Sequence, residues 1–266
     1  MSSVIEPGAP LQWTAPDVVA FDGITYRTFG DPDGLLDAAT LLRLSTLRST
    51  PEEMVLAKTR SNIERCLEAY RDLRPVNAIE LGIYEGGSVA LLATLCRPGR
   101  LVALDLDPEP RLALEEVLRR QGLEGSVALH YGVDQADRAR LTEIVEQEFE
   151  GPLDLVIDDA SHLVAQTRAS FNLLFPRLRP GGLYAIEDWA WAHTSAPGLL
   201  PDQPPLSQLV FELVVASATA SEAITSVEVN RELTLVRRGP QPVDPEHFDL
   251  RDLVDDRARG LLREFP

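Results

Sequence analysis

Two acidic clusters carry the side chains best suited to chemistry. The first reads Asp158-Asp159-Ala160-Ser161-His162 and the second reads Glu187-Asp188. Each follows an apolar run typical of a buried strand, 153–157 and 182–186. Because consecutive strands of a parallel sheet end at the same edge, where ligands gather, we expect the two clusters to lie close together. Carboxylates with an imidazole beside them predict a hard-cation site next to a general base.

A glycine-containing turn follows an earlier strand, in the order Glu80-Leu81-Gly82-Ile83-Tyr84-Glu85-Gly86-Gly87-Ser88. Glycines let the backbone turn sharply against a ligand, and the next helix begins with free N–H groups. The pattern is not the G-x-G-x-x-G fingerprint of dinucleotide binding. An ordinary strand–helix turn would carry similar glycines, so other features must support a ligand site here.

The next two strands also end in polar residues. Asp105 lies near the end of the run 101–106 and 23 residues beyond Gly82, and an acid at that spacing can accept the hydroxyls of a ribose. A solvated loop acid that caps the following helix is the alternative, and it suits Asp107 better. Asp134 and Gln135 follow the strand predicted at 127–131 and are placed to meet an adenine.

The elements that position these residues alternate between strand and helix. This alternation predicts a parallel sheet covered by helices, with strands at 76–81, 101–106, 127–131, 153–157 and 183–186 and helices at 88–95, 109–121, 136–149 and 165–178. A helix near 206–218 and a hairpin at 224–229 and 233–236 should add antiparallel strands to one edge. We divide the chain into an N-terminal extension of cap helices (1–75), a main domain (76–238) and an acidic tail (239–266) with a short helix at 250–264.

The first 75 residues carry few patterns. Short strand-like pieces occur at 18–21 and 24–26. Thr50-Pro51-Glu52-Glu53 has the cap, proline and acids of a helix start, so we predict a helix from there to about Leu73. We expect this extension and the proline-rich stretch 196–205 to cover the site and to set acceptor choice.

Composition excludes some classes of function. Twenty-five basic and 42 acidic residues give a net charge of −17, which argues against binding a nucleic-acid backbone. We find neither a signal peptide nor an apolar run long enough to span a membrane, and we expect a cytoplasmic protein. Cys66 and Cys96 are predicted to be free thiols.

The glycine turn, the ribose acid and the polar loop after the third strand occur in the order found in class I S-adenosylmethionine-dependent methyltransferases, which the chain resembles over 76 to about 238. The resemblance implies an α/β, Rossmann-like fold with a seven-stranded, mostly parallel sheet of order 3-2-1-4-5-7-6 and an antiparallel strand 7. It also implies that S-adenosyl-L-methionine is the cofactor. The residues expected around it are Gly82, Tyr84 and Ser88 at the methionine part with Glu80 beneath, Asp105 at the ribose, and Asp134 and Gln135 near the adenine.

A narrower resemblance comes from Asp-Asp-x-Ser-His followed by Pro-Gly-Gly-x-Tyr-x-Ile-Glu-Asp. These patterns are similar to macrolide-sugar O-methyltransferases of the mycinamicin type and to cephalosporin hydroxylase-like proteins. The resemblance implies that Asp159, Glu187 and Asp188 bind Mg²⁺ or another divalent cation and that His162 is the catalytic base. Catechol-type relatives carry a lysine at the position of His162. Asp158 is assigned to the cofactor, beneath its amine, with a helix cap as the alternative.

The predicted function is transfer of a methyl group from S-adenosylmethionine to a hydroxyl of a small molecule, in particular a natural-product sugar. A catechol or phenol methyltransferase, a hydroxylase-like enzyme and a non-transferring member of the fold remain as alternatives. Partners are expected to be small-molecule acceptors, with neither nucleic acid nor membrane, and the resemblance implies a homo-oligomer. Of the other candidates, Trp189, Trp191 and His193 either contact the acceptor or pack the loop, His130 is structural, and His247 lies exposed in the tail.

Overall fold

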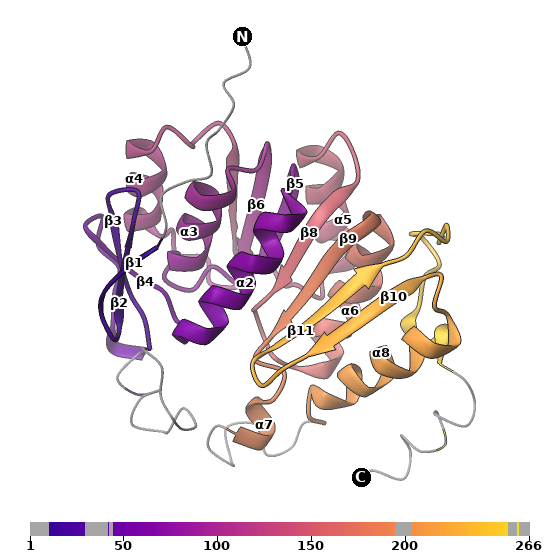
Figure 1. Cartoon of the computed structure of the whole chain (residues 1–266). Helices are drawn as coiled ribbons and strands as arrows, with labels where there is room; N and C mark the ends of the chain where they lie inside the picture. The colour runs from indigo at the N-terminus through magenta and orange to yellow at the C-terminus, as the bar shows by residue number, and fades with distance from the viewer. Residues whose placement is uncertain (1–10, 30–41, 43–44, 195–203, 255–259, 261–266) are drawn as a thin grey trace.

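A seven-stranded sheet forms the centre of the molecule in the computed structural model, which describes residues 11–29, 42, 45–194, 204–254 and 260. The strand order is β10-β11-β9-β8-β5-β6-β7 (Figure 1). The strands are β5 (Asn77–Leu81), β6 (Arg100–Asp105), β7 (Val127–Tyr131), β8 (Leu153–Asp158), β9 (Leu178–Glu187), β10 (Ile224–Val229) and β11 (Leu233–Arg238). Counted from β5, this is the predicted order 3-2-1-4-5-7-6, and β11 runs antiparallel to β9 as expected.

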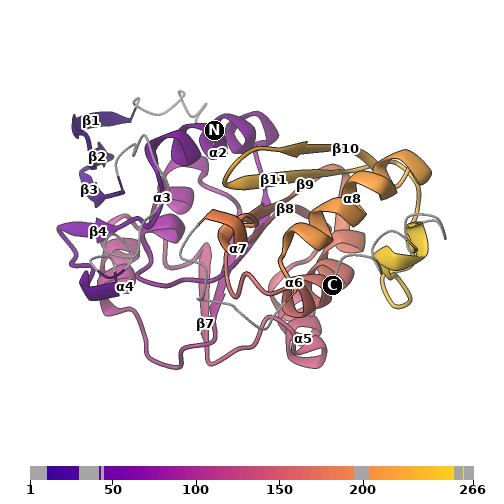
Figure 2. The same ribbon diagram turned by 90° about the horizontal axis from the view of Figure 1, so that it is seen from below.

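Helices cover both faces of this sheet, which confirms the predicted fold class (Figure 2). On one face lie α2 (Arg60–Leu73), α3 (Gly87–Cys96) and α4 (Leu112–Arg120), and their apolar residues pack with alternate residues of the central strands. On the other face lie α5 (Arg138–Glu148), α6 (Val164–Leu174) and α8 (Ser207–Thr219). Every residue of β8 is buried, as expected for a strand between two helical layers.

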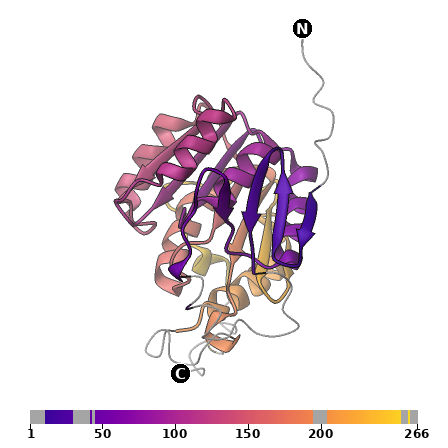
Figure 3. The same ribbon diagram turned by 90° about the vertical axis from the view of Figure 1, so that its left-hand side faces the viewer.

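A second, smaller sheet is formed by the N-terminal part of the chain. It contains β1 (Gln12–Ala15), β2 (Val18–Phe21), β3 (Ile24–Arg27) and β4 (Glu53–Val55), in that order. The first three strands are antiparallel, and β4 pairs in parallel with β3. This sheet (indigo) stands beside α3 in Figure 1 and faces the viewer in Figure 3.

The prediction of a helix from Thr50 is wrong for its first turns. Glu53–Val55 is a strand, and α2 begins only at Arg60, where the Thr59 side chain accepts a hydrogen bond from the Asn62 N–H. Thr50 caps a turn instead of a helix, because its hydroxyl accepts a hydrogen bond from the Glu53 N–H. Met54 and Val55 are buried, so strand pairing with β3 and apolar packing outweigh the local cap signal.

The ends of the chain are described only in part. Of the predicted C-terminal helix, the structure shows a short 3₁₀ turn, η2 (Leu250–Leu253), which ends at the extended Val254; 255–259 and 261–264 lie outside the described residues. Most of the proline-rich stretch 196–205 lies outside them too. Cys66 and Cys96 are free thiols, as predicted. Among the described residues, no helix combines the length and the apolar character needed to cross a membrane.

Candidate cofactor and cation site

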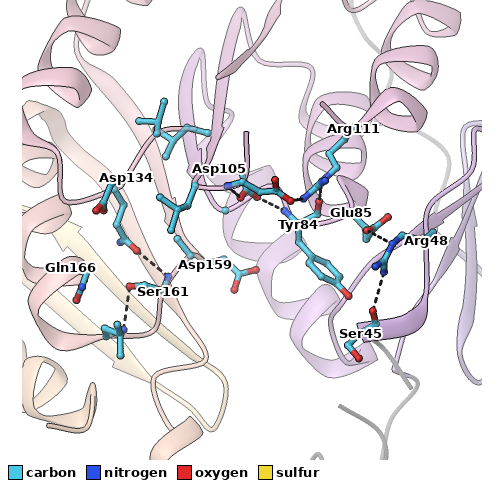
Figure 4. Close-up of a pocket in the computed structure, with 18 residues that line it drawn as sticks. Ser45, Arg48, Tyr84, Glu85, Asp105, Arg111, Asp134, Asp159, Ser161 and Gln166 are labelled. Carbon is cyan, nitrogen blue, oxygen red and sulfur yellow. Dashed lines mark hydrogen bonds and ion pairs between the residues drawn. The ribbon is translucent and has the colours of Figure 1, made fainter. Parts of the chain in front are cut away.

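A cleft of about 570 Å³ runs along the carboxyl ends of the central strands (Figure 4). Five of the predicted cofactor residues line it, together with Asp159 from the end of β8: Gly82, Tyr84, Asp105, Asp134 and Gln135. Its volume and its mixture of apolar and polar side chains are those of a small-molecule site.

The turn after β5 needs glycine at position 82 for a measurable reason. Gly82 has φ +99°, and a Cβ there would lie 2.2 Å from the main-chain oxygen of Asp159. The two loops are held together by a hydrogen bond of 2.9 Å from the Asp159 N–H to the Leu81 carbonyl. Gly82 therefore permits the glycine turn and the acidic loop after β8 to touch.

Asp105 fixes the shape of this turn from β6. Its Oδ2 accepts hydrogen bonds from the N–H groups of Ile83 (2.9 Å) and Tyr84 (2.8 Å), and its Oδ1 accepts one from Asp107 (2.8 Å). A carboxylate offers about four acceptor positions, so Asp105 keeps capacity for a ligand hydroxyl. Asp107 is a loop acid as expected, since it accepts from the Glu109 N–H and pairs with Arg111, but it does not cap the next helix: α4 begins after Arg111 without a side-chain cap.

Gln135 and Asp158 join the loops that follow β7 and β8. The Gln135 amide donates to Asp158 Oδ1 (3.0 Å) and accepts from the Ser161 N–H (2.9 Å). Asp158 also accepts from the hydroxyls of Ser170 (2.6 Å) and Tyr184 (2.9 Å). Asp158, which was assigned to the cofactor, is absent from the residues lining the cleft, and burial raises its pKa to about 6. We assign it the positioning of Gln135.

Glu80, in β5, and Ser88, in α3, are in contact with each other and do not line the cleft. The Ser88 hydroxyl donates to Glu80 Oε1, while Glu80 Oε2 has no hydrogen-bond partner among the described residues. Burial raises the pKa of Glu80 to about 8. Both residues line a separate small cavity of about 30 Å³ that Lys58 and Tyr70 also border. Neither residue is among those that line the cleft, so their place at the methionine part of the cofactor stays a prediction.

Three of the predicted chemical residues converge beside the cleft, which Asp159 itself lines. One ligand atom from each of Asp159, His162 and Asp188 lies within 4.8 Å of the others. His162 (φ 56°) and Asp188 (φ 53°) both adopt the left-handed conformation. For a side chain with a Cβ this costs about 1–2 kcal/mol, and such strain persists at sites where surrounding structure imposes it. The two carboxylates, with Glu187 next to Asp188 in sequence, are oxygen donors that fit a divalent cation.

His162 lies in an environment that favours its neutral form. Burial lowers its pKa below the ordinary 6.5, although the nearby Asp159 carboxylate acts in the opposite direction. The ring packs against Trp191, with centroids 4.5 Å apart.

Lys58 also lies at this site, and sequence reasoning missed it. Its Nζ is 2.7 Å from Asp159 Oδ2 and 2.5 Å from Glu187 Oε2, and the Asn62 amide donates to the same Glu187 oxygen (3.0 Å). Burial opposes a charge on Lys58, but Asp159 and Glu187 raise its pKa well above the ordinary value. Burial also raises the pKa of Glu187 and of Asp188. One signal was available, because Lys58 is the single lysine of a chain with 24 arginines.

The N-terminal segment contributes to the cleft as well. Ser45 and Arg48 line it beside Tyr84, and Glu85 accepts a hydrogen bond from the Ser49 N–H (2.8 Å) (Figure 4). Neither Ser45 nor Arg48 belongs to a motif. Their presence agrees with the expectation that the extension covers the site.

The remaining candidates are placed as follows. Trp189 donates to the Asn230 carbonyl (2.7 Å), and His193, in α7 (Trp191–Thr194), pairs with the Ser207 hydroxyl (2.8 Å). His130 bonds Glu148 (3.0 Å), as a structural histidine would, and His247 is exposed beside Asp244. Of these residues, Trp191 alone is placed against the predicted base.

Comparison with known proteins agrees with the fold. Residues 79–189 match the family described as a methyltransferase domain. The chain is 33% identical over 155 residues to mycinamicin VI 2''-O-methyltransferase of Micromonospora griseorubida, covering 56% of this chain and 35% of that protein. It is 35% identical over 132 residues to 8-demethyl-8-alpha-L-rhamnosyl tetracenomycin-C 2'-O-methyltransferase of Streptomyces olivaceus, covering 47% and 31%. The chain therefore spans about a third of the length of these curated relatives.

Solved structures give the same result. The methyltransferase MycE from the mycinamycin biosynthetic pathway, in complex with Mg, SAH and mycinamycin VI, superposes with a TM-score of 0.50 at 26% identity, over 67% of this chain and 49% of MycE. The O-methyltransferase TomG from Streptomyces achromogenes, in complex with SAM, has a TM-score of 0.50 at 18% identity, over 76% and 96%, and shows the fold alone. Sheet order and similarity agree: the chain has a Rossmann-like methyltransferase fold, and its residues 79–189 match a methyltransferase domain.

Proposed function

We propose that this protein is a metal-dependent O-methyltransferase that moves a methyl group from S-adenosylmethionine to a hydroxyl of a natural-product sugar. The observation that carries the proposal is the clustering of Asp159, His162 and Asp188 beside the cleft that Asp159 itself lines. A cofactor in that cleft would have its sulfonium end beside a base and a cation site.

The cofactor is assigned by the residues of the cleft. In the proposal, Asp134 and Gln135 lie near the adenine, Asp105 accepts a ribose hydroxyl, and Gly82 and Tyr84 surround the methionine part. Glu80 and Ser88 are also assigned to this end. Burial raises the pKa of Glu80 to about 8, and the positive charge of a methionine amine beside it would lower that pKa and favour the ionised carboxylate that attracts the amine.

The cation site is assigned to Asp159, Glu187 and Asp188. Oxygen ligands and open coordination positions are typical of Mg²⁺. When bound, such a cation lowers the pKa of an acceptor hydroxyl and orients it. Glu187 already accepts hydrogen bonds from Lys58 and Asn62 through Oε2, so its role depends on the remaining oxygen.

His162 supplies the proton transfer in this scheme. A sugar hydroxyl is a poor nucleophile, and the acceptor nitrogen of His162 takes its proton as the oxygen attacks the methyl carbon. The carbon–oxygen bond forms while the sulfur–carbon bond breaks, which leaves the cofactor as its demethylated thioether. Since this is a direct displacement, alignment of the hydroxyl with the methyl group supplies much of the rate. Trp191 holds the imidazole ring in place.

The sugar acceptor rests on similarity to relatives whose names specify methylated sugars of macrolides and tetracenomycin. A panel of glycosylated macrolides, glycosylated aromatic polyketides and catechols, assayed by product mass with and without EDTA, tests it. We expect a gain of one methyl group on a glycoside, lost with EDTA and restored by Mg²⁺. Methylation of catechols alone would overturn the sugar acceptor, and EDTA-insensitive turnover would overturn the metal.

A matched pair of variants tests the site itself. Asp159→Asn should abolish metal-dependent turnover and keep cofactor binding, measured by calorimetry with S-adenosylmethionine. Asp244→Asn makes the same change in an exposed residue away from the cleft and should leave both unchanged. Near-normal turnover of Asp159→Asn would contradict the proposed cation site.

A further inference from the structure

Lys58 is unusual in both the sequence and the structure. Twenty-four of the 25 basic residues are arginines, and Lys58 is the exception. Its side chain is only 9% exposed, in contact with two carboxylates. Lysine presents a compact point charge, whereas arginine presents a broad planar fork. The compact ammonium group of Lys58 therefore lies between the carboxylates of Asp159 and Glu187.

The position of Lys58 is set by the start of α2. Thr59, the next residue, caps that helix, and its hydroxyl donates to Glu232 Oε2 (2.7 Å). The Glu232 carbonyl in turn accepts from the Asp188 N–H (2.7 Å). These hydrogen bonds connect the start of α2 to the loop that carries Asp188. They fix the backbone beside Lys58, whose ammonium group lies between Asp159 and Glu187.

The same carboxylates that Lys58 contacts are those proposed for the divalent cation. Buried carboxylates are costly unless a positive charge or hydrogen bonds compensate them, and Lys58 provides that compensation. A divalent cation on the other oxygens of Asp159 and Glu187 would lie close to the ammonium and repel it, since like charges interact strongly in a buried site. Cation binding therefore disfavours the contacts of Lys58 with Asp159 and Glu187, and those contacts disfavour cation binding.

We infer that Lys58 is a built-in counter-ion of the acidic site that competes with the divalent cation for Asp159 and Glu187. The inference rests on the proposed cation site and adds a control on it. Lys58 keeps the carboxylates paired when the cation is absent, and it weakens cation binding. A protein without the Lys58 charge should bind the divalent cation more tightly.

Calorimetric titration with Mg²⁺ tests this inference on wild-type protein, Lys58→Gln and Arg119→Gln. Arg119 is exposed on α4 and pairs with Glu116, so its variant makes the same change in net charge away from the site. We expect Lys58→Gln to bind Mg²⁺ at least about tenfold more tightly than wild type, and Arg119→Gln to bind as wild type does. Saturating Mg²⁺ should also raise the melting temperature of Lys58→Gln more than that of wild type.

The outcomes separate the two ideas. Tighter binding by Lys58→Gln supports the inference, including the case in which wild type shows no binding. Equal or weaker binding by Lys58→Gln overturns it and leaves the cation site standing. Absence of Mg²⁺ binding in all three proteins overturns both.

A second measurement, on wild-type protein, tests the inference if Lys58→Gln does not fold. Wild-type protein labelled with ¹⁵N-lysine gives one side-chain amine signal, because the chain has one lysine. Displacement of Lys58 predicts that this signal shifts as Mg²⁺ binds. An unchanged signal while calorimetry records Mg²⁺ binding would overturn the inference.

Discussion

Replacing Gly82 with alanine should damage both stability and activity. The new Cβ would lie 2.2 Å from the Asp159 oxygen and 2.8 Å from its carbonyl carbon, and both are main-chain atoms that move only with the loop. A positive φ costs a side chain about 1–2 kcal/mol, and relief of the overlap adds about 1–3 kcal/mol. The free energy of unfolding should therefore fall by about 2–5 kcal/mol, which is about 4–10 °C in melting temperature for a chain of this length.

Thermal unfolding followed by circular dichroism measures this loss, with Gly122→Ala as the matched control. Gly122 also has a positive φ (+66°), but a Cβ there would meet no atom within 4 Å. The control should lose only the conformational part, about 1–2 kcal/mol or about 2–4 °C. At a temperature where both variants are folded, Gly82→Ala should also lose about 100-fold in kcat/KM, because its contact moves Asp159. Equal melting temperatures for the two variants, or normal turnover of Gly82→Ala, would refute the close contact between the turn at Gly82 and the loop that carries Asp159.

Three further predictions concern charged groups of the site. Asp105→Ala should weaken binding of S-adenosylmethionine by at least about tenfold in calorimetry, because it removes the acceptor that holds the glycine turn; unchanged affinity would contradict this role. In the proposed reaction His162 must be neutral to accept a proton, and burial lowers its pKa, so kcat/KM should fall only when the pH drops below 6.5, and His162→Ala should lose this acidic limb of the pH profile. Burial raises the pKa of Asp158 from 3.8 to about 6. Protonation of Asp158 therefore stabilises the folded state fully below pH 3.8, and this stabilisation is lost as the pH rises through about 6. Asp158→Asn should flatten this part of the dependence of melting temperature on pH, and an identical profile would show that another group causes it.

The sequence predicted the main sheet well, because strand and helix patterns alternate and each central strand is a continuous apolar run. The order of the strands was correct through a resemblance, since alternation alone leaves the order open. Prediction failed at Thr50, where a cap, a proline and two acids indicate a helix but pairing of β4 with β3 decides. Local signals describe only neighbours in sequence, and this pairing joins residues on either side of a long intervening segment.

The sequence predicted only those residues of the candidate site that lie at or just after the ends of strands. Asp159, His162 and Asp188 were found together because parallel strands end at one edge. Lys58 could not be placed, because its contacts join residues 101 and 129 positions apart in sequence. Asp158 shows a different limit: the pattern marks a strand end but does not say on which side of the sheet a carboxyl points.

The hydrogen bond from Asp188 to Glu232 has a consequence for how the protein is made. β11 lies between β9 and β10, so the main sheet is complete only after residues 233–238 have left the ribosome. The loop that carries Glu187 and Asp188 gains its anchor at the same late stage. Because closing a contact between distant residues costs chain entropy, the acidic edge should be among the last parts to form. A chain stopped before Glu232 would leave β9 without its antiparallel partner and the carboxylates of that strand end without their anchor.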